Sequence, residues 1–226
     1  MNFSYLLIFL LAVNCSCSTQ KDQNPKTLIH SITSGLIKNN TIPFPLYLTD
    51  KLENRLDLEK KYSNNLFIIH TGHILKPELS KEENEKNLYL LSTEGFNLVN
   101  LTLEDFIVAD NQSIDFEKHD SLLFLNSSII DLNLDHLISA KNISAQFIFQ
   151  GMAFIGLSDD KINPNLNKEK FIINDYVLSI LKVKNNVLKT NPQHNLKSFI
   201  IVHSLGNEIN DVMLRLPPSF INLLAD

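Results

Sequence analysis

Short runs of β-branched and aromatic residues recur along this chain, with helical patterns between them, and this alternation limits the folds open to it. The runs have the length and composition of buried strands. They are Thr27–Ile32, Leu66–His70, Phe96–Leu101, Leu122–Asn126 and Phe199–His203. Two further runs, Ala145–Gln150 and Met152–Leu157, lie on either side of Gly151 and predict a hairpin.

Four segments between these runs carry leucine, isoleucine and valine at helical spacing. They are Asp50–Tyr62, which begins at an Asp cap, Lys81–Ser92, Asp175–Leu188 and Asn207–Leu216, which Pro217 ends. Strands that alternate with helices predict an α/β fold with a largely parallel sheet covered on both faces.

The N-terminus predicts export and a lipid anchor. Tyr5–Val13 is an apolar run of nine residues, too short for the roughly 20 that span a bilayer but typical of a secretory signal. Leu11–Cys15 follows as a loose version of the box at which lipoprotein signals are cut, with Cys17 as a second candidate. We expect a signal peptide over 1–14, a lipidated polar tether over 15–25 with attachment at Cys15, and one domain over 26–226. The alternative is an ordinary cleaved signal with two idle cysteines.

The composition argues against two kinds of cysteine site and against one class of partner. Cys15 and Cys17 are the two cysteines of the chain, so the domain has no disulfide framework or cysteine metal site and needs an ordinary core, for which 44% apolar residues suffice. The net charge is −5 with no basic stripe, which argues against nucleic acid. The expected location is the bacterial cell envelope, lipid-anchored on a face left open, with membrane contact through the lipid and an unidentified protein or small-ligand partner.

Ligands of parallel sheets bind beyond the carboxyl ends of the strands, so candidate site residues should follow the strands. These positions are Ser34-Gly35, His70–His73, Thr102–Asp105, Ser158–Asp160 and His203.

Five segments in order resemble the calcineurin-like metallophosphoesterases, in particular the bacterial 5′-nucleotidase-type branch. They are Leu66–Leu75 (LFIIHTGHIL), Gly95–Phe106 (GFNLVNLTLEDF), Gly151–Ser158 (GMAFIGLS), Phe199–Gly206 (FIIVHSLG) and Leu216–Leu224 (LPPSFINLL). The resemblance implies a sandwich of mostly parallel sheets flanked by helices. It also implies two adjacent divalent cations, held by Asp, His and Asn ligands and one bridging carboxylate, with a metal-bound hydroxide as the nucleophile.

Matched position by position, the chain departs from that ligand set. The first Asp-x-His falls near Ile32 and Ser34, and the Gly-Asp motif becomes Gly72-His73, with an imidazole at the bridging position. The family's Asn and catalytic His fall on Leu103 and Glu104, and Asp105 takes an acidic position that shapes the loop.

The remaining motifs are also incomplete. The next family His survives as His203 with an offset of one residue, and the last motif, Gly-His-x-His, does not occur before the sequence ends at Asp226. We therefore expect a degenerate, truncated member, a pseudoenzyme without catalytic residues or a cofactor, kept for binding or structure around a relic pocket of Gly72, Glu104 and Asp105.

Two alternatives stay open. The first is a phosphoesterase or nucleotidase-type hydrolase with one divalent metal, zinc or manganese, held by His70, His73 and His203. The second is an unrelated α/β lipoprotein that binds an envelope or host partner.

Several of these residues also have plain structural interpretations. Glu104 and Asp105 are typical of helix-start acids, Asp159 and Asp160 of a turn, and His203 of a hydrogen-bonded structural histidine. No partner spacing assigns a role to the other histidines, which are His30, His119, His136 and His194.

Overall fold

The structure, a computed structural model, describes residues 35–37, 42, 44–62, 65–190, 196, 198–216 and 220–224. They belong to one compact unit, Ile32–Asp226. Within these residues no helix combines the length and the apolarity needed to cross a bilayer. The expected signal peptide, tether and lipid site at Cys15 or Cys17, the Thr27–Ile32 strand, His30 and His194 lie outside them.

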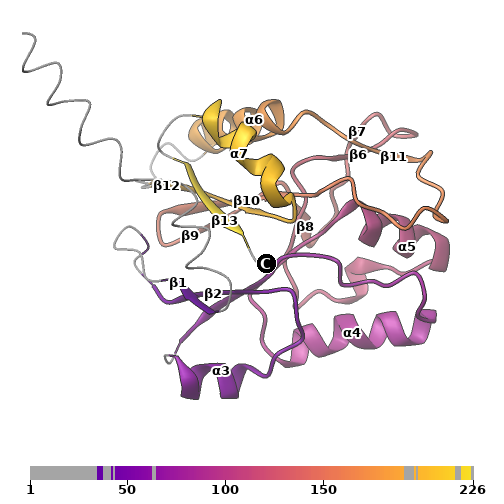
Figure 1. Cartoon of the computed structure of the whole chain (residues 1–226), viewed down its shortest axis with the longest axis horizontal. Helices are drawn as coiled ribbons and strands as arrows, with labels where there is room; N and C mark the ends of the chain where they lie inside the picture. The colour runs from indigo at the N-terminus through magenta and orange to yellow at the C-terminus, as the bar shows by residue number, and fades with distance from the viewer. Residues whose placement is uncertain are drawn as a thin grey trace, which may run out of the picture. The chain divides into compact units, whose positions relative to one another are not determined.

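The first sheet has six strands in the order β1-β2-β3-β4-β5-β8 (Figure 1). β1 is antiparallel to β2, and the other five strands run parallel. Their bounds are β1 Gly35–Ile37, β2 Leu46–Thr49, β3 Phe67–His70, β4 Leu98–Asn100, β5 Phe124–Leu125 and β8 Ile143–Ser144.

The second sheet has the order β13-β12-β10-β9. β13, β12 and β10 are parallel, and β9 pairs antiparallel with β10 in the predicted hairpin. The bounds are β9 Gln146–Phe149, β10 Met152–Leu157, β12 Ser198–His203 and β13 Phe220–Leu224. A small antiparallel sheet, β11-β6-β7, consists of β6 Ile129–Asp131, β7 His136–Leu137 and β11 Phe171–Ile173.

The helices lie on the outer faces of the two large sheets (Figure 1). Those beside the first sheet are α3 Arg55–Lys61, α4 Lys81–Thr93 and α5 Leu103–Gln112, followed by the short 3-10 helix η1 Phe116–Lys118. Those beside the second sheet are α6 Tyr176–Thr190 and α7 Ile209–Leu214, which follows the 3-10 helix η2 Gly206–Glu208.

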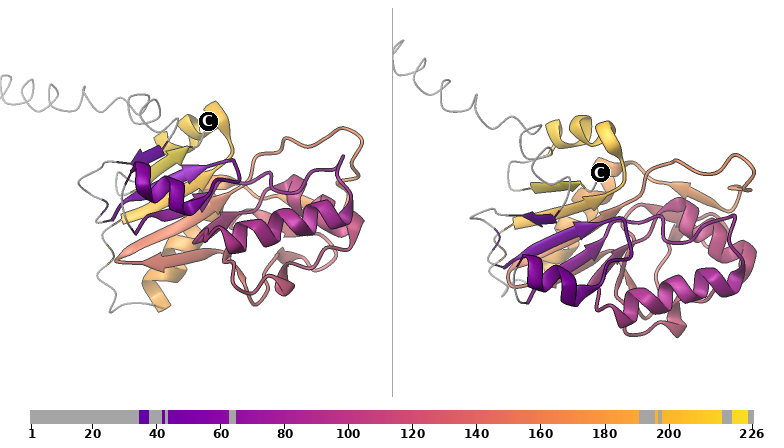
Figure 2. Two further views of the ribbon diagram at one scale, coloured as in Figure 1. Left: turned by 90° about the horizontal axis from the view of Figure 1, so that it is seen from below. Right: turned by 60° about the horizontal axis from the view of Figure 1, so that its bottom comes forward.

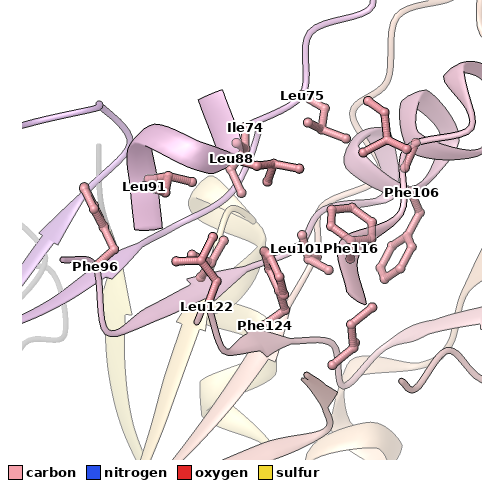
Figure 3. Packing of buried hydrophobic residues seen from close by; sticks show 14 of the residues in the cluster. Ile74, Leu75, Leu88, Leu91, Phe96, Leu101, Phe106, Phe116, Leu122 and Phe124 are labelled. Carbon is pink, nitrogen blue, oxygen red and sulfur yellow. The ribbon is translucent and has the colours of Figure 1, made fainter. Parts of the chain in front are cut away.

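Three apolar clusters hold these layers together. Leu88 and Leu91 of α4 and Phe106 of α5 meet Phe124 of the first sheet (Figure 3). Between the sheets, Phe67 and Phe154 stack at 5.3 Å between ring centroids. Beyond the second sheet, Ile155 and its neighbours pack against α6 and α7. Figure 2 shows the same order of layers from two other directions.

Alternation along each strand explains the layering. In β10, Met152 and Phe154 face the first sheet, whereas Ala153, Ile155 and Leu157 face α6. Because both faces of the strand are covered, the strand is apolar throughout, as expected for a parallel sheet. The predicted α/β sandwich of mostly parallel sheets flanked by helices is confirmed.

Some predicted boundaries are wrong. Gly35, expected just after a strand, is itself a strand residue, in β1. The first described helix begins at Arg55, because the side chain of Asn54, not Asp50, accepts the backbone N–H groups of its first turn. The segment 207–216 divides into η2 and α7. The sequence pattern does not reveal β2, since four residues after Pro45 carry little periodicity.

Candidate functional site

The carboxyl ends of β3, β4, β10 and β12 meet at one edge of the sandwich. The Oγ atom of Ser158, after β10, accepts the backbone N–H of Leu103 at the start of α5 at 2.6 Å. The N–H of Asp159 donates to Oγ of Ser204, after β12, at 3.0 Å. These bonds join segments far apart in the sequence, as the rule for parallel sheets predicts.

Asp105 organises the loops at this edge. It is fully buried, and its two oxygens accept five hydrogen bonds. Oδ1 accepts the N–H groups of Ile74 and Leu75 at 2.7 and 2.8 Å. Oδ2 accepts the N–H of His73 at 3.1 Å and both the N–H and the Oγ1 hydroxyl of Thr102 at 2.9 and 2.8 Å.

The same carboxylate also begins α5. Thr102 and Asp105 form a capping box, in which each side chain accepts the backbone N–H of the other residue. The interpretation of Asp105 as a helix-start acid is therefore confirmed. Burial raises the pKa of the Asp105 carboxyl, while the hydrogen bonds from Leu75 and Thr102 and the nearby His73 act in the opposite direction.

His73 lies between two further carboxylates. Its Nδ1 is 3.5 Å from Oε2 of Glu104, and its Nε2 is 3.3 Å from both oxygens of Asp159. The Asp159 side chain is 3% exposed and that of Glu104 14%. Glu104 also accepts the N–H of Asn163 through Oε1 at 2.9 Å. The hydrogen bond from the ring is to Oδ2 of Asp159, and within the described residues Oδ1 of Asp159 has no hydrogen-bond partner.

This arrangement favours the charged imidazole. The hydrogen bond with Asp159 raises the pKa of His73, and the charges of Asp105, Asp159 and Glu104 add to this effect against partial burial. An imidazolium donates from both ring nitrogens, which suits acceptors on both sides of the ring. We call this group, His73 with Glu104 and Asp159, the imidazole cluster.

His70 and His203 have a different role, and each is the last residue of its strand. Nδ1 of His70 accepts the N–H of Gly72 at 3.3 Å, and Nδ1 of His203 accepts the N–H of Leu205 at 3.1 Å. Both rings are buried, and burial lowers the pKa of His70 to about 3. A neutral ring that accepts at Nδ1 carries its proton on Nε2, so neither nitrogen keeps a lone pair for a metal.

Gly72 is required by geometry. Its φ is 121°, and a Cβ atom there would lie 2.4 Å from Cγ2 of Thr102. The loop after β3 therefore approaches the end of β4 more closely than any side chain permits. This contact brings His73 to the position from which it reaches Glu104 and Asp159.

The structure thus brings together only part of the predicted set. Gly72, His73, Glu104 and Asp105 lie at one edge, but His70, His73 and His203 do not form a ligand set, since no group of three or more His, Cys, Asp or Glu side chains among the described residues is placed to hold a metal ion. The interpretation of Asp159 as a turn residue is incomplete. The position of Asp159 just after a predicted strand could have indicated that it lies at the same edge as His73, with which it pairs.

Comparisons with known proteins identify the architecture. The structure is similar to a 5′-nucleotidase precursor of Thermus thermophilus, with a TM-score of 0.53, 12% identity, and coverage of 81% of this chain and 36% of that one. The chain has the fold of the 5′-nucleotidase-type metallophosphoesterases. Two further matches share this fold. NAD nucleotidase of Haemophilus influenzae gives a TM-score of 0.50 and 15% identity, and the match covers 74% of this chain and 30% of that one. Sulfate thiohydrolase SoxB of Thermus thermophilus gives a TM-score of 0.55 and 10% identity, and the match covers 74% of this chain and 32% of that one.

The likeness to this metallophosphoesterase-type fold is structural and partial. The chain spans about a third of the length of these solved proteins. No family model matches the sequence. No curated protein matches it either.

Asp105→Asn should destabilise the protein strongly. The amide NH₂ would face backbone N–H donors, leaving at least one buried donor without an acceptor, at a cost of about 2 kcal/mol or more. Urea unfolding measures the loss. Asp57→Asn is the control, because Asp57 is 76% exposed and pairs with Lys60 at the surface, and it should change stability by less than about 0.5 kcal/mol. A similar effect of both variants would contradict the anchoring role of Asp105.

The imidazole cluster predicts a stability contribution that fades in alkaline solution. The folded-state pKa of His73 lies above its usual 6.5, so the contribution is complete below 6.5 and is lost as the pH rises through the raised pKa. His73→Gln should therefore cost about 1 kcal/mol near pH 6 and less at higher pH, measured by urea unfolding across pH.

A matched control separates this effect from that of His70. Since the pKa of His70 is lowered to about 3, its stabilising contribution is complete above 6.5 and is lost as the pH falls toward 3. The loss of stability that His70 causes as the pH falls from 6.5 toward 3 should persist in His73→Gln. A cost of His73→Gln that is constant from acid to alkaline solution would contradict the ion pair.

Proposed function

We propose that this protein is an envelope lipoprotein whose metallophosphoesterase-like domain has no phosphoesterase activity and acts as a binding protein. One observation carries the proposal. Where the family resemblance predicts a bridging carboxylate, the side chain is the His73 imidazole, paired with Glu104 and Asp159 at 3.5 and 3.3 Å. An imidazole whose pKa its acidic neighbours raise lies where two dications would need an anion.

The other donors do not fit a dinuclear centre either. Asp105 already accepts five hydrogen bonds from the protein. The Nδ1 atoms of His70 and His203 accept backbone N–H groups. Two adjacent divalent cations need several carboxylate or neutral imidazole lone pairs directed at them, and Asp105, His70 and His203 direct theirs at backbone N–H groups.

The electrostatics of the edge also disfavour phosphate esters. Glu104, Asp105 and Asp159 contribute carboxyl groups, and His73 alone among the cluster supplies a compensating cation. A phosphate ester that approached would meet this acidic edge without the dications that neutralise its charge in the family's mechanism. We infer that the edge does not retain the nucleotide substrates of metallophosphoesterases.

Metal and activity measurements test the loss of catalysis. We expect purified protein to contain well under one equivalent of zinc or manganese by elemental analysis, and to release no phosphate from nucleoside monophosphates when either metal is added. Stoichiometric metal that disappears in His203→Ala but not in His136→Ala, a surface histidine, would support the single-metal hydrolase instead. Metal-dependent phosphate release would overturn the proposal directly.

Lipid attachment is tested separately in a bacterial host. The sequence around Cys15 motivates the expectation that the chain incorporates radiolabelled palmitate and that Cys15→Ser abolishes the label. Cys17→Ser is the matched control, with label retained. Label that disappears in Cys17→Ser and remains in Cys15→Ser would show that Cys17 is the attachment site. No label in the unsubstituted protein would refute the lipid anchor.

A further inference from the structure

A pocket of about 310 Å³ lies away from the strand-end site, between α5, η1 and the small sheet. Its floor includes Phe106, Phe116 and Phe171. The ring of Phe106 lies 5.8 Å from that of Phe116 and 6.1 Å from that of Phe171, between centroids. The three side chains are 5–7% exposed, whereas Phe124 behind them is 1% exposed. Ligand pockets start at about 300 Å³, so the occupant is small.

The rim of the pocket is strongly acidic. Asp110, Asp115, Glu117 and Asp131 line it together with one cation, Lys170. An apolar lining below an excess of carboxylates is complementary to an organic cation, because the lining accepts its apolar part and the carboxylates attract its charge directly. An anionic ligand would be repelled by the same rim.

The chain already contains an ammonium group bound in this way. Nζ of Lys170 contacts Oδ1 of Asp110 and lies 4.0 Å from Oδ2 of Asp131. It also lies 5.2 Å from the centroid of the Phe171 ring. An ammonium therefore occupies one side of the pocket, between two carboxylates and over an aromatic ring, supplied by the protein itself.

The other side of the rim has carboxylates without such a partner. Asp115 and Glu117 form no salt bridge with any described residue. Oδ1 of Asp115 accepts the N–H of Glu117 at 2.9 Å, and Oε1 of Glu117 accepts the N–H of Lys141 at 3.2 Å. These bonds fix the two side chains but leave their charge uncompensated.

We propose that this pocket binds a small organic ammonium ion, a primary or methylated amine on a short apolar body. The apolar body lies on the phenylalanine floor, and the ammonium group lies beside Asp115 and Glu117. No lining residue of the pocket belongs to the imidazole cluster, so this inference and the proposed function succeed or fail independently.

Calorimetric titration of the full chain tests the site with three probes of one shape. Phenethylammonium should bind about tenfold more tightly than the neutral phenethyl alcohol, and 3-phenylpropionate should bind least, because two carboxylates favour the cation. High salt should reduce the preference for the cation. Equal affinity for cation and alcohol would overturn the proposal.

Two variants should shift the affinity in opposite directions. Asp115→Asn with Glu117→Gln keeps both hydrogen-bond acceptors and removes both charges, so phenethylammonium should bind no more tightly than the alcohol. Lys170→Met removes the competing ammonium and exposes the charges of Asp110 and Asp131, so the same probe should bind several-fold more tightly. Circular dichroism confirms that each variant is folded.

The results separate a site from general charge attraction. Unchanged affinity in the double variant, or weaker binding in Lys170→Met, would overturn the proposed site. N-acetyl-lysine N-methylamide carries the same ammonium on a peptide unit. Weaker binding of this probe than of phenethylammonium supports a free amine as ligand, and tighter binding would overturn that choice in favour of a partner's lysine side chain.

Discussion

The architecture of the strand-end edge depends on one buried carboxylate. Asp105 accepts N–H groups from the loop after β3 and from the start of α5, and so joins two segments about 30 residues apart. A carboxylate with five donors is rigid, since any movement would leave buried N–H groups without acceptors. His73 is the first residue of the loop that Asp105 fixes, and its ring position follows from this anchor.

The imidazole cluster differs from the charge balance that the family resemblance implies. The fold is shared with metallophosphoesterases, and the resemblance predicts dications held by anions at this edge. In this chain that position holds the His73 imidazole, with the acidic residues Glu104 and Asp159 on either side. When protonated, this imidazole neutralises the acids without an ion from solution, and it then has no lone pair to give a metal.

The further pocket follows the same electrostatic logic on a different surface. Lys170 partly compensates the acidic rim, and Asp115 and Glu117 keep their charge. Both places combine buried apolar walls with carboxylates, which are largely buried at the strand-end edge and mostly exposed at the pocket. At the strand-end edge the compensating cation is part of the protein, whereas in the pocket we infer that part of it is a ligand.

The sequence by itself determined the class of the fold. Runs such as Leu66–His70 and Met152–Leu157 are apolar enough to be covered on both faces, and that property implies a parallel sheet between helices whatever their partners. It also indicated that Asp105 lies in the first turn of a helix, where Asp105 forms a capping box with Thr102. A strand of four residues such as β2 is too short for its pattern to be distinctive and is specified by its neighbours.

Only the tertiary structure decided the partners of the site residues. His73 and Asp159 are 86 positions apart. No spacing rule links a loop after a strand of the first sheet to a loop after a strand of the second. The sequence also does not predict the partners of the His70 and His203 ring nitrogens, because a metal and a backbone N–H leave the same residue pattern. Strand order and the stacking of two sheets set those distances, and with them the difference between a metal ligand and a structural histidine.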